Sequence, residues 1–571
     1  MAEVLVLTYS GQVSIPTSLE VASVERFSSF NDILTVLFKR GNIETEINHA
    51  TVVVLDDGKP SSSSLSKLDG LSFEDKQIIL TQFFSHIHPI ILALSLLEEQ
   101  AKNVNKAIKV IDAFIGQRIV RVESWTGTGK KNIDDYSETT IPSSVPVLLN
   151  EFPLDSTVNT MQSILSRSTG TSPFKLGHLQ LLFLILVEEI DFLSLLSNTS
   201  QAHLAKLCHL VGHWSFPANE LSNDDLVYCA YLILHYALQF QNTTNTDLHI
   251  PTKNELLCLL FLVRDCYRCG SPFHNFRHAV DVLQACFHYV VRLDCLPIFK
   301  QFEVNVKLDE CGFLNSTRRT YDVVELAALP IKISYKYLTP IELLGLLVAA
   351  LGHDVGHPGV TNAFMIKYNS PICQIYNGRS VLENYHTAVF TSKILSVGWP
   401  SILNQKTDED NETIKNLIIS SILATDMAEH FEYIDRLNKF DYANSNHPQR
   451  AKLILALLIK CADISNVTRP LRVSSQWAVT LSREFDEIAK LEERISSSST
   501  PANEHEEVRY NKVPLKLEDI LDANPMIHKG QIFFINTFAE KLFNNVVKLL
   551  PELQYTCNII SENKEFWLAR D

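Results

Sequence analysis

The chain has 571 residues, of which 46% are hydrophobic and 20% charged, a composition that is typical of a globular protein and excludes a disordered or fibrous one. This length predicts a catalytic-sized domain together with a smaller one. The formal net charge of -15, from 50 Lys plus Arg against 65 Asp plus Glu, disfavours nucleic acid or an anionic membrane surface as the main partner.

The first 125 residues predict a small α/β domain. Short β-branched runs at Glu3–Thr8 and Thr51–Leu55 indicate strands. Two later segments, Lys76–Leu97 and Lys106–Arg121, have the apolar spacing of helices. We expect this domain to contribute packing or regulation and no catalytic group.

Two acidic residues, Asp56 and Asp57, directly follow the second predicted strand. Receiver domains carry acidic residues at the ends of their strands, so a receiver-like regulatory domain is one interpretation. A turn capped by the sequence Asp-Asp-Gly is the alternative, because aspartate side chains readily accept hydrogen bonds from the backbone of a turn.

A change of composition marks the predicted domain boundary. The segment Trp125–Ser144 is rich in Gly, Thr, Ser, Lys and Asp, which is typical of a linker or exposed loop. We therefore predict a linker at residues 126–150. In residues 151–571 the apolar residues recur at helical spacing, and no run of alternating strands is found, so this part is predicted to be an all-helical catalytic domain.

Several features indicate a cytoplasmic location, with presence in the nucleus also compatible. The first residues lack the basic start and cleavage pattern of a secretory signal. The apolar run Leu179–Val187 stops at Glu188 and is too short for a membrane span. The 11 cysteines form no repeated short-spacing pattern, which favours reduced thiols and an intracellular protein.

The segment FHNFRHAVDV places His274 and His278 four residues apart. On a helix, this spacing puts both imidazoles on the same face, where they could share a metal ion. A pair of hydrogen-bonded structural histidines is the alternative.

A second segment is a stronger candidate for a metal site. Thr339, Pro340 and Glu342 have the pattern of a helix N-terminus, and the helix that follows is almost entirely apolar. It ends in HDVGHPG, which begins with His353 and Asp354. Burying such polar groups costs free energy unless they have partners, and a metal ion would supply one. A capped, hydrogen-bonded helix end is the alternative.

The third segment, Leu453–Asn466, is another apolar helix and ends close to Asp463. Taken alone, this carboxylate could equally pair with an arginine or with backbone amides. Together, the candidate ligands are two imidazoles and two carboxylates, namely His278, His353, Asp354 and Asp463. This set suits Zn²⁺ or another divalent transition ion, and Asp354 could bridge to a second, mostly water-coordinated ion such as Mg²⁺. The sequence thus outlines a two-metal hydrolytic site.

The order His, His-Asp, Asp in a helical protein resembles the HD-domain phosphohydrolases. Five segments extend the resemblance to the class I cyclic nucleotide phosphodiesterases: HNFRH at His274–His278, HDVGHPG at His353–Gly359, ENYH at Glu383–His386, TDMAEH at Thr425–His430 and ADISNVTRP at Ala462–Pro470. The likeness covers roughly residues 200–555, and by length and organisation the chain is similar to the fungal high-affinity cAMP phosphodiesterases.

The resemblance implies a role for each matching residue. His278, His353, Asp354 and Asp463 match the ligands of the first of two divalent metals, which are Zn and Mg in the family, with Mn an option in the second site. His274 matches the general acid that protonates the departing 3′ oxygen, while a hydroxide bridging the two metals is the nucleophile. The residues expected to orient the metal surroundings are His357, Glu383, His386 and Thr425. The residues expected to contact the purine are Asn466, Leu481, Gln531 and Phe534.

The activity implied is hydrolysis of 3′,5′-cyclic AMP to 5′-AMP, which would lower intracellular cAMP signalling. Asn466 favours cAMP because its amide can both donate to and accept from adenine, whereas Gln531 can flip to suit either purine. The alternatives are a dual cAMP/cGMP phosphodiesterase, another HD-family phosphohydrolase, and an inactive nucleotide-binding scaffold.

Overall fold

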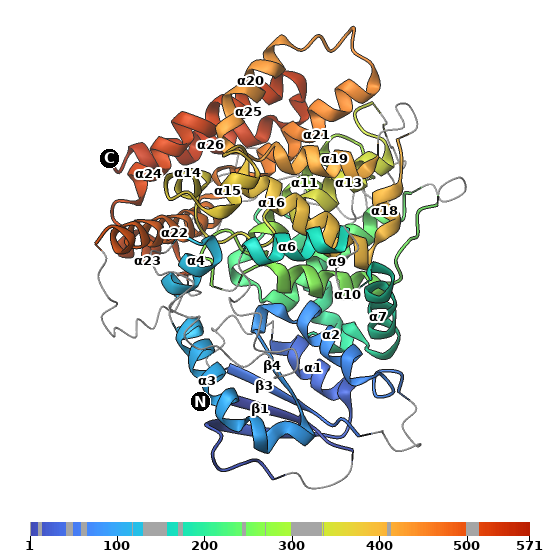
Figure 1. Ribbon diagram of the computed structural model, residues 1–571. Helices are drawn as coiled ribbons and strands as arrows, with labels where there is room; N and C mark the ends of the chain where they lie inside the picture. The colour runs from blue at the N-terminus through green and yellow to red at the C-terminus, as the bar shows by residue number, and fades with distance from the viewer. Residues whose placement is uncertain are drawn as a thin grey trace.

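A parallel β-sheet near the amino terminus and a large helical assembly make up the fold (Figure 1). The computed structural model describes residues 2–9, 14–40, 50–58, 66–116, 118–128, 157–168, 175–241, 247–268, 270–297, 334, 336–407, 413–497 and 513–571. This arrangement confirms the predicted fold class, an all-helical domain preceded by a small α/β domain.

The sheet has the strand order β2-β1-β3-β4, and all of its pairs are parallel. Its strands are β1 (Ala2–Leu7), β2 (Val21–Phe27), β3 (Ala50–Leu55) and β4 (Ile90–Ala93). The helices that pack against it are α1 (Phe30–Arg40), α2 (Phe73–Phe83) and α3 (Leu97–Gly116). Every residue of the central strand β3 is buried, as expected for a parallel strand covered on both faces.

Two details of the predicted α/β domain are wrong. The segment Lys76–Leu97 is not one helix, because α2 ends at Phe83 and Ile90–Ala93 forms strand β4. A short apolar run fits a buried strand as well as a helix, so periodicity could not separate the two. Strand β2 and helix α1 had no counterpart in the sequence prediction.

The acidic residues after β3 lie in a hydrogen-bonded turn. Asp56 accepts hydrogen bonds from the backbone N–H groups of Tyr9 (2.8 Å) and Gly58 (2.9 Å). Asp57 accepts from the hydroxyl of Ser95 (2.5 Å) and from its backbone (3.2 Å). These contacts are those of the Asp-Asp-Gly turn. The strand order is nevertheless that of flavodoxin-like sheets, so a receiver-like role stays a prediction.

Helix α4 (Arg118–Thr126) follows α3 and corrects the start of the predicted linker. Trp125 and Thr126 were expected in an exposed loop, but both are buried, and the carbonyl of Thr126 accepts a hydrogen bond from Ser370. The remaining predicted linker residues, from 129 to 150, lie outside the described residues. The boundary at residue 151 therefore stays a prediction.

From residue 157 onward the described elements are helical, apart from one isolated bridge between Lys406 and Thr413. The first helices are α6 (Thr157–Ser168), α7 (Leu176–Glu189), α8 (Gln201–Val211), α9 (Asn223–Leu238), α10 (Lys253–Cys266), α11 (Phe276–Arg292), α13 (Pro340–Gly352), α14 (Asn362–Lys367), α15 (Pro371–Ile375) and α16 (Val381–Val389). They are followed by α17 (Ser396–Gly398), α18 (Pro400–Asn404), α19 (Ile414–Leu423), α20 (His430–Lys439), α21 (His447–Asp463), α22 (Leu471–Ser497), α23 (Leu517–Ala523), α24 (Ile527–Phe534), α25 (Glu540–Leu549) and α26 (Gln554–Leu568). Among the described residues, no helix has both the length and the hydropathy needed to cross a bilayer.

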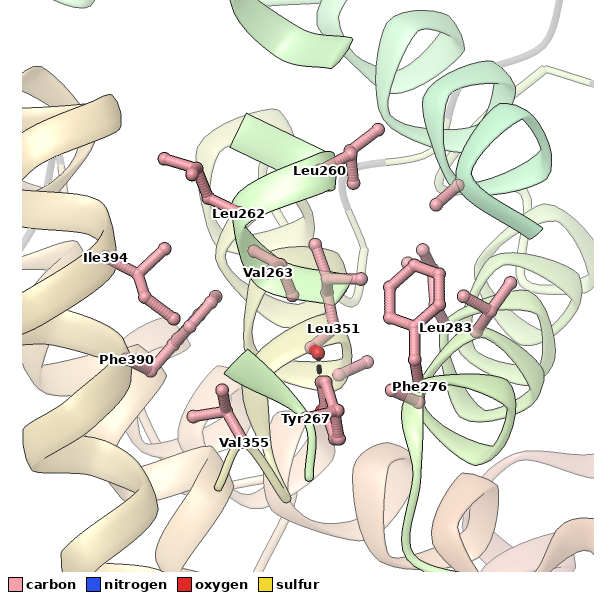
Figure 2. Close-up of a cluster of buried hydrophobic side chains, with 14 of the residues drawn as sticks. Leu260, Leu262, Val263, Tyr267, Phe276, Leu283, Leu351, Val355, Phe390 and Ile394 are labelled. Carbon is pink, nitrogen blue, oxygen red and sulfur yellow. Dashed lines mark hydrogen bonds between the residues drawn. The ribbon is translucent and has the colours of Figure 1, made fainter. Parts of the chain in front are cut away.

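Helix α13 runs through the centre of the helical part. It begins as predicted, with Thr339 at the N-cap, Pro340 in the first turn and a hydrogen bond from the Thr339 N–H to Glu342 (2.8 Å). Its buried faces pack against α9, α11, α19 and α21. Figure 2 shows the core at its far end, where the Tyr267 hydroxyl donates to the carbonyl of Leu351 (2.7 Å). This bond fixes the end of the helix from which His353 and Asp354 emerge.

Gly352, the last residue of α13, has no room for a side chain. A methyl group there would lie 2.3–2.4 Å from three ring carbons of Phe390. We expect Gly352→Ala to lower the free energy of unfolding by about 1–3 kcal/mol, since overpacking forces neighbours to shift. Chemical denaturation would measure this loss. Gly177→Ala in α7 is the control, because nothing lies within 4 Å of the added methyl, and equal stability of the two variants would contradict the packing argument.

Candidate metal centre

Three helix ends bring four of the predicted site residues together. His278 lies in the first turn of α11, His353 and Asp354 directly follow α13, and Asp463 is the last residue of α21. One nitrogen or oxygen atom from each lies within 4.8 Å of the others. Nε2 of His278 is 3.1 Å from Oδ1 of Asp463 and 3.6 Å from Oδ2 of Asp354. The structure therefore gathers the candidate ligands around one point.

The donor atoms of this cluster fit a divalent cation. Nε2 of His353 and Oδ2 of Asp354 are 3.1 Å apart, and both atoms are buried. Nδ1 of His353 donates to the carbonyl of Ala350 (2.8 Å), which directs Nε2 at the cluster. Burial would lower the pKa of His353, but Asp354 and Asp463 hold it well above its usual range, so a cation would bind Nε2 in place of a proton. Buried polar atoms are costly without partners, and a cation bound here would satisfy both of them.

The carboxylates of the cluster are ionised. Burial alone would favour their protonated forms, but the imidazole of His353 holds the pKa of Asp354 well below its usual range. Hydrogen bonds with His278 and His353 likewise hold the pKa of Asp463 below its usual range, against the effect of burial. Two negative charges are thus available to a cation at neutral pH.

Two further predicted residues adjoin the other side of Asp354. Nε2 of His386 is 3.8 Å from Oδ1 of Asp354, and its Nδ1 donates to the carbonyl of Val355 (2.8 Å). Nδ1 of His357 accepts from the backbone N–H of Gly359 (3.0 Å), so the proton of the neutral ring is on Nε2. Burial lowers the pKa of His386 to about 4, while burial and the nearby His274 hold the pKa of His357 well below its usual range. Both rings are therefore neutral.

His274 does not share a helical face with His278, which corrects the prediction from their spacing. Helix α11 begins at Phe276, and Asn275 is its N-cap, accepting a hydrogen bond from the backbone of His278 (3.2 Å). His274 thus lies in the loop before the helix. Its ring still stacks on that of His357, with 4.0 Å between the ring centroids, and lies 5.8 Å from His278.

Glu484 of α22 is a site residue that the sequence prediction missed. Its Oε1 accepts a hydrogen bond from Nδ1 of His274, and its Oε2 accepts from Ser271 Oγ (3.1 Å) and the Phe273 N–H (3.0 Å). Burial disfavours a charged imidazole, but the carboxylate of Glu484 outweighs it and raises the pKa of His274 to about 9. In turn, the pKa of Glu484 lies well below its usual range. At neutral pH the two groups form a partly buried ion pair.

A signal for Glu484 is present in the sequence. Trp477, Leu481 and Glu484 are spaced by four and three residues, so one helical face carries two apolar side chains and a carboxylate. A glutamate on an apolar face requires a partner. The partner, His274, is 210 residues away in the chain, and the pattern on α22 could not identify it.

Glu383 and Thr425 are also buried or nearly so. The carboxylate of Glu383 accepts hydrogen bonds from the side chain of Asn362 at 2.9 and 3.1 Å. Burial, together with the neighbouring Asp426, raises the pKa of Glu383 to about 7. The hydroxyl of Thr425, in the turn after α19, donates to the carbonyl of Ile422 (2.8 Å), which leaves its lone pairs as acceptors.

The four residues predicted to contact a purine come from three neighbouring elements. Asn466 follows α21 and Gln531 lies on α24; both are buried, and neither Oδ1 of Asn466 nor Oε1 of Gln531 has a hydrogen-bond partner among the described residues. Leu481 of α22 and Phe534 of α24 are partly buried. Phe533 is 63% exposed, so Phe534 is the better placed of the two phenylalanines to line a pocket.

Comparison with known proteins places the chain in a family. The sequence profile described as 3′5′-cyclic nucleotide phosphodiesterase matches residues 316–560, which include His353, Asp354 and Asp463. The crystal structure of yeast caPDE2 in complex with IBMX is 44% identical in sequence, with 100% of both chains covered and a TM-score of 0.83. The chain belongs to the cyclic nucleotide phosphodiesterase family. The family resemblance drawn from the motifs is thereby confirmed.

Two curated relatives of this phosphodiesterase are similar over shorter stretches. The 3′,5′-cyclic-nucleotide phosphodiesterase 2 of Saccharomyces cerevisiae is 30% identical, over 67% of this chain and 65% of its own length. The cGMP-specific 3′,5′-cGMP phosphodiesterase 3 of Dictyostelium discoideum is 29% identical, over 55% of this chain and 56% of its own length. The chain therefore spans less than two thirds of each of these two relatives.

Proposed function

We propose that the chain hydrolyses 3′,5′-cyclic AMP to 5′-AMP at the cluster of His278, His353, Asp354 and Asp463. The observation that carries the proposal is the gathering of one donor atom from each of these four residues within 4.8 Å of one another, in a chain of this family. Two carboxylates buried this close together are costly unless positive charge neutralises them, and a divalent cation supplies that charge. The cluster therefore supports a metal-dependent hydrolase over an inactive scaffold.

The ligand set supports two divalent ions. Two imidazoles and two carboxylates suit Zn²⁺, while Oδ1 of Asp354, on the side of His386, could bind a second ion that is mostly water-coordinated, such as Mg²⁺ or Mn²⁺. When bound, divalent cations activate water as a nucleophile at neutral pH and offset the charge that develops on the phosphate. The chain contributes the ionised carboxylates and the oriented imidazoles that would hold these cations.

We assign His274 as the general acid that protonates the departing 3′ oxygen. With a pKa raised to about 9, its ring carries a proton at neutral pH. Nδ1 of His274 donates its hydrogen bond to Glu484, so the Nε2–H remains available to a leaving group. Stacking on His357 fixes the plane of the His274 ring. Geometry and protonation state thus both meet the needs of a general acid.

The pairing with Glu484 predicts how activity depends on pH. The acid must be protonated, so activity is retained below the pKa of His274 and falls as the pH rises through about 9. In Glu484→Gln, the main group that raises this pKa loses its charge, and we expect the alkaline limb of kcat/KM to move to lower pH. A pH–rate profile measures this shift. Glu493→Gln, an exposed position on the same helix, should leave the limb in place, and an unshifted limb in Glu484→Gln would refute the pairing.

The base specificity is tested by assaying cAMP and cGMP side by side. Asn466 favours adenine, and we expect kcat/KM for cAMP to exceed that for cGMP by at least about tenfold, since a correctly paired amide rejects a mismatched edge. A dual-specificity enzyme is the second candidate, because the amide of Gln531 suits either purine and one relative is named as cGMP-specific. Comparable rates would support that candidate and leave the phosphodiesterase chemistry intact.

The proposed enzyme works in the cytoplasm. The described cysteines are free thiols, and most of them are buried, as in proteins of a reducing compartment. Location of a fluorescently tagged chain in a vesicle or outside the cell would contradict this assignment, whereas a nuclear fraction would agree with it.

A further inference from the structure

Helix α4 reaches from the amino-terminal part of the chain to the helix that carries Glu484. Figure 1 shows α4 beside α22, beyond the end of α3, and the two helices are in contact. Arg118 of α4 is only 4% exposed, and its Nε donates to Oε2 of Glu487 at 2.9 Å. Glu487 lies three residues after Glu484. A largely buried ion pair therefore joins α4 to the turn of α22 in which Glu484 binds His274.

The guanidinium of Arg118 also lies against two loops of the site. A methyl group on Gly359 would be 2.6 Å from Nη2 of Arg118, and a methyl group on Gly270 would be 3.5 Å from Cδ and 3.9 Å from Nη1 of Arg118, beside Nη2 of Arg121 at 3.3 Å. Both glycines have positive φ angles, 78° and 79°, so each loop bends sharply where the arginine meets it. The backbone N–H of Gly359 donates to Nδ1 of His357, and Ser271, next to Gly270, donates to Glu484.

A second side chain of α4 reaches the same loops. The guanidinium of Arg268 lies over the ring of Trp125, with 4.6 Å between Cζ of Arg268 and the ring centroid. Nε of Arg268 in turn donates to the carbonyl of Gly356 (3.0 Å), in the turn between Asp354 and His357. Through two separate arginines, α4 therefore supports the loop of His357, and through Arg118 it also supports the loop of His274.

We propose that α4 is a positioning element of the catalytic centre and that Arg118 is the residue through which it mainly acts. The inference rests on the proposed function, and it gives the amino-terminal part of the chain a role that packing alone does not. A buried ion pair contributes little net stability compared with apolar packing, because desolvation offsets its attraction. A planar guanidinium does, however, fix the direction of the groups it touches. A shift of about 1 Å in such groups can cost a hundredfold in rate.

The test compares Arg118→Met, Glu487→Gln and the double variant with the wild type. We expect each to lower kcat for cAMP at least about tenfold with KM within about twofold, because the chemical step depends on the position of the loops. The double variant should be no worse than the more severe single variant, since the two residues act as a unit. Glu487→Gln keeps the size of the side chain, so it still tests the positioning role if Arg118→Met does not fold.

A matched control is available on the same two helices. Arg494 of α22, seven residues after Glu487, lies 3.4 Å from Glu123 of α4, so a second ion pair also ties the two helices together. Arg494→Met should leave kcat unchanged. If it lowers kcat as much as Glu487→Gln, or if kcat loss in all variants follows the unfolded fraction, α4 only packs and the proposal is overturned.

Hydrogen–deuterium exchange separates this inference from the proposed function. Amide exchange in residues 270–275 and 354–360 should become faster in Arg118→Met and Glu487→Gln and stay unchanged in Arg494→Met. This result is expected even if the wild type fails to hydrolyse cyclic nucleotides, an outcome that would refute only the proposed function. Unchanged exchange in both loops would overturn the role of Arg118 whatever the activity.

Discussion

Replacing Asp354 by asparagine should lower kcat for cAMP by at least about a thousandfold, which corresponds to about 4 kcal/mol of transition-state stabilisation. The two oxygens of this carboxylate face different partners, with Oδ2 near His353 and Oδ1 near His386. An amide retains the shape but removes the negative charge that would hold cations on both sides. Initial rates at saturating cAMP measure the effect.

Two measurements accompany the Asp354→Asn assay. Elemental analysis of the purified variant should show less bound divalent metal than the wild type, and circular dichroism should show the same helical content. Asp519→Asn, an exposed position on α23, is the matched control and should leave both rate and metal content unchanged. Hydrolysis by Asp354→Asn at a rate near that of the wild type would show that the cluster is not the catalytic centre.

His274→Gln should lower kcat by about a hundredfold to ten-thousandfold, which is the usual contribution of a positioned general acid. Glutamine can still make hydrogen bonds with neighbouring groups but cannot deliver a proton to a leaving oxygen at neutral pH. We therefore expect the fall to appear in kcat with little change in KM, and the alkaline limb near pH 9 to disappear from the pH–rate profile. Bound metal should remain, because His274 is not among the four clustered ligands.

A second histidine–glutamate pair gives this variant a control. Nε2 of His447 lies 3.0 Å from Glu342, at the opposite end of α13 from the cluster. His447→Gln should leave kcat and the alkaline limb unchanged. If His274→Gln retains the wild-type rate, or loses metal together with activity, the residue does not act as the general acid.

The sequence predicted the helical domain well because its helices carry complete local signals. The start of α13 has a capping residue, a proline in the first turn and a glutamate three residues after the cap, and each is found where expected. The α/β domain was predicted less accurately. Strand β4 is four residues long and wholly apolar, and only its pairing with β3 distinguishes it from a continuation of α2.

The candidate site likewise contains some residues that the sequence predicted and others that it missed. His353 and Asp354 stand out because a buried helix delivers them, and the structure gathers them with His278 and Asp463. Glu484, in contrast, was missed because its meaning depends on a contact with His274 that no local pattern encodes. The position of His274 outside α11 was also missed, because residue spacing implies a shared face only if the helix includes both residues.

Arg118 shows a further limit of prediction from sequence. Its partners, Glu487 and the backbone near Gly359, lie 241 to 369 residues away and come from two different elements. Nothing in the composition of Trp125–Ser144 indicated that the preceding residues of α4 pack against the loop of His357. Contacts between segments this far apart follow from the tertiary fold and not from local propensity.

The central claim is that hydrolysis depends on divalent metal held by the cluster, and metal removal tests it most directly. Purified protein is assayed for cAMP hydrolysis before treatment with a chelator, after elemental analysis shows that the metal has been removed, and again after Zn²⁺ and Mg²⁺ are added back. We predict that 5′-AMP formation is lost with the metal and restored by its return, in the wild type but not in Asp354→Asn. Undiminished 5′-AMP formation by the metal-free protein would contradict the claim.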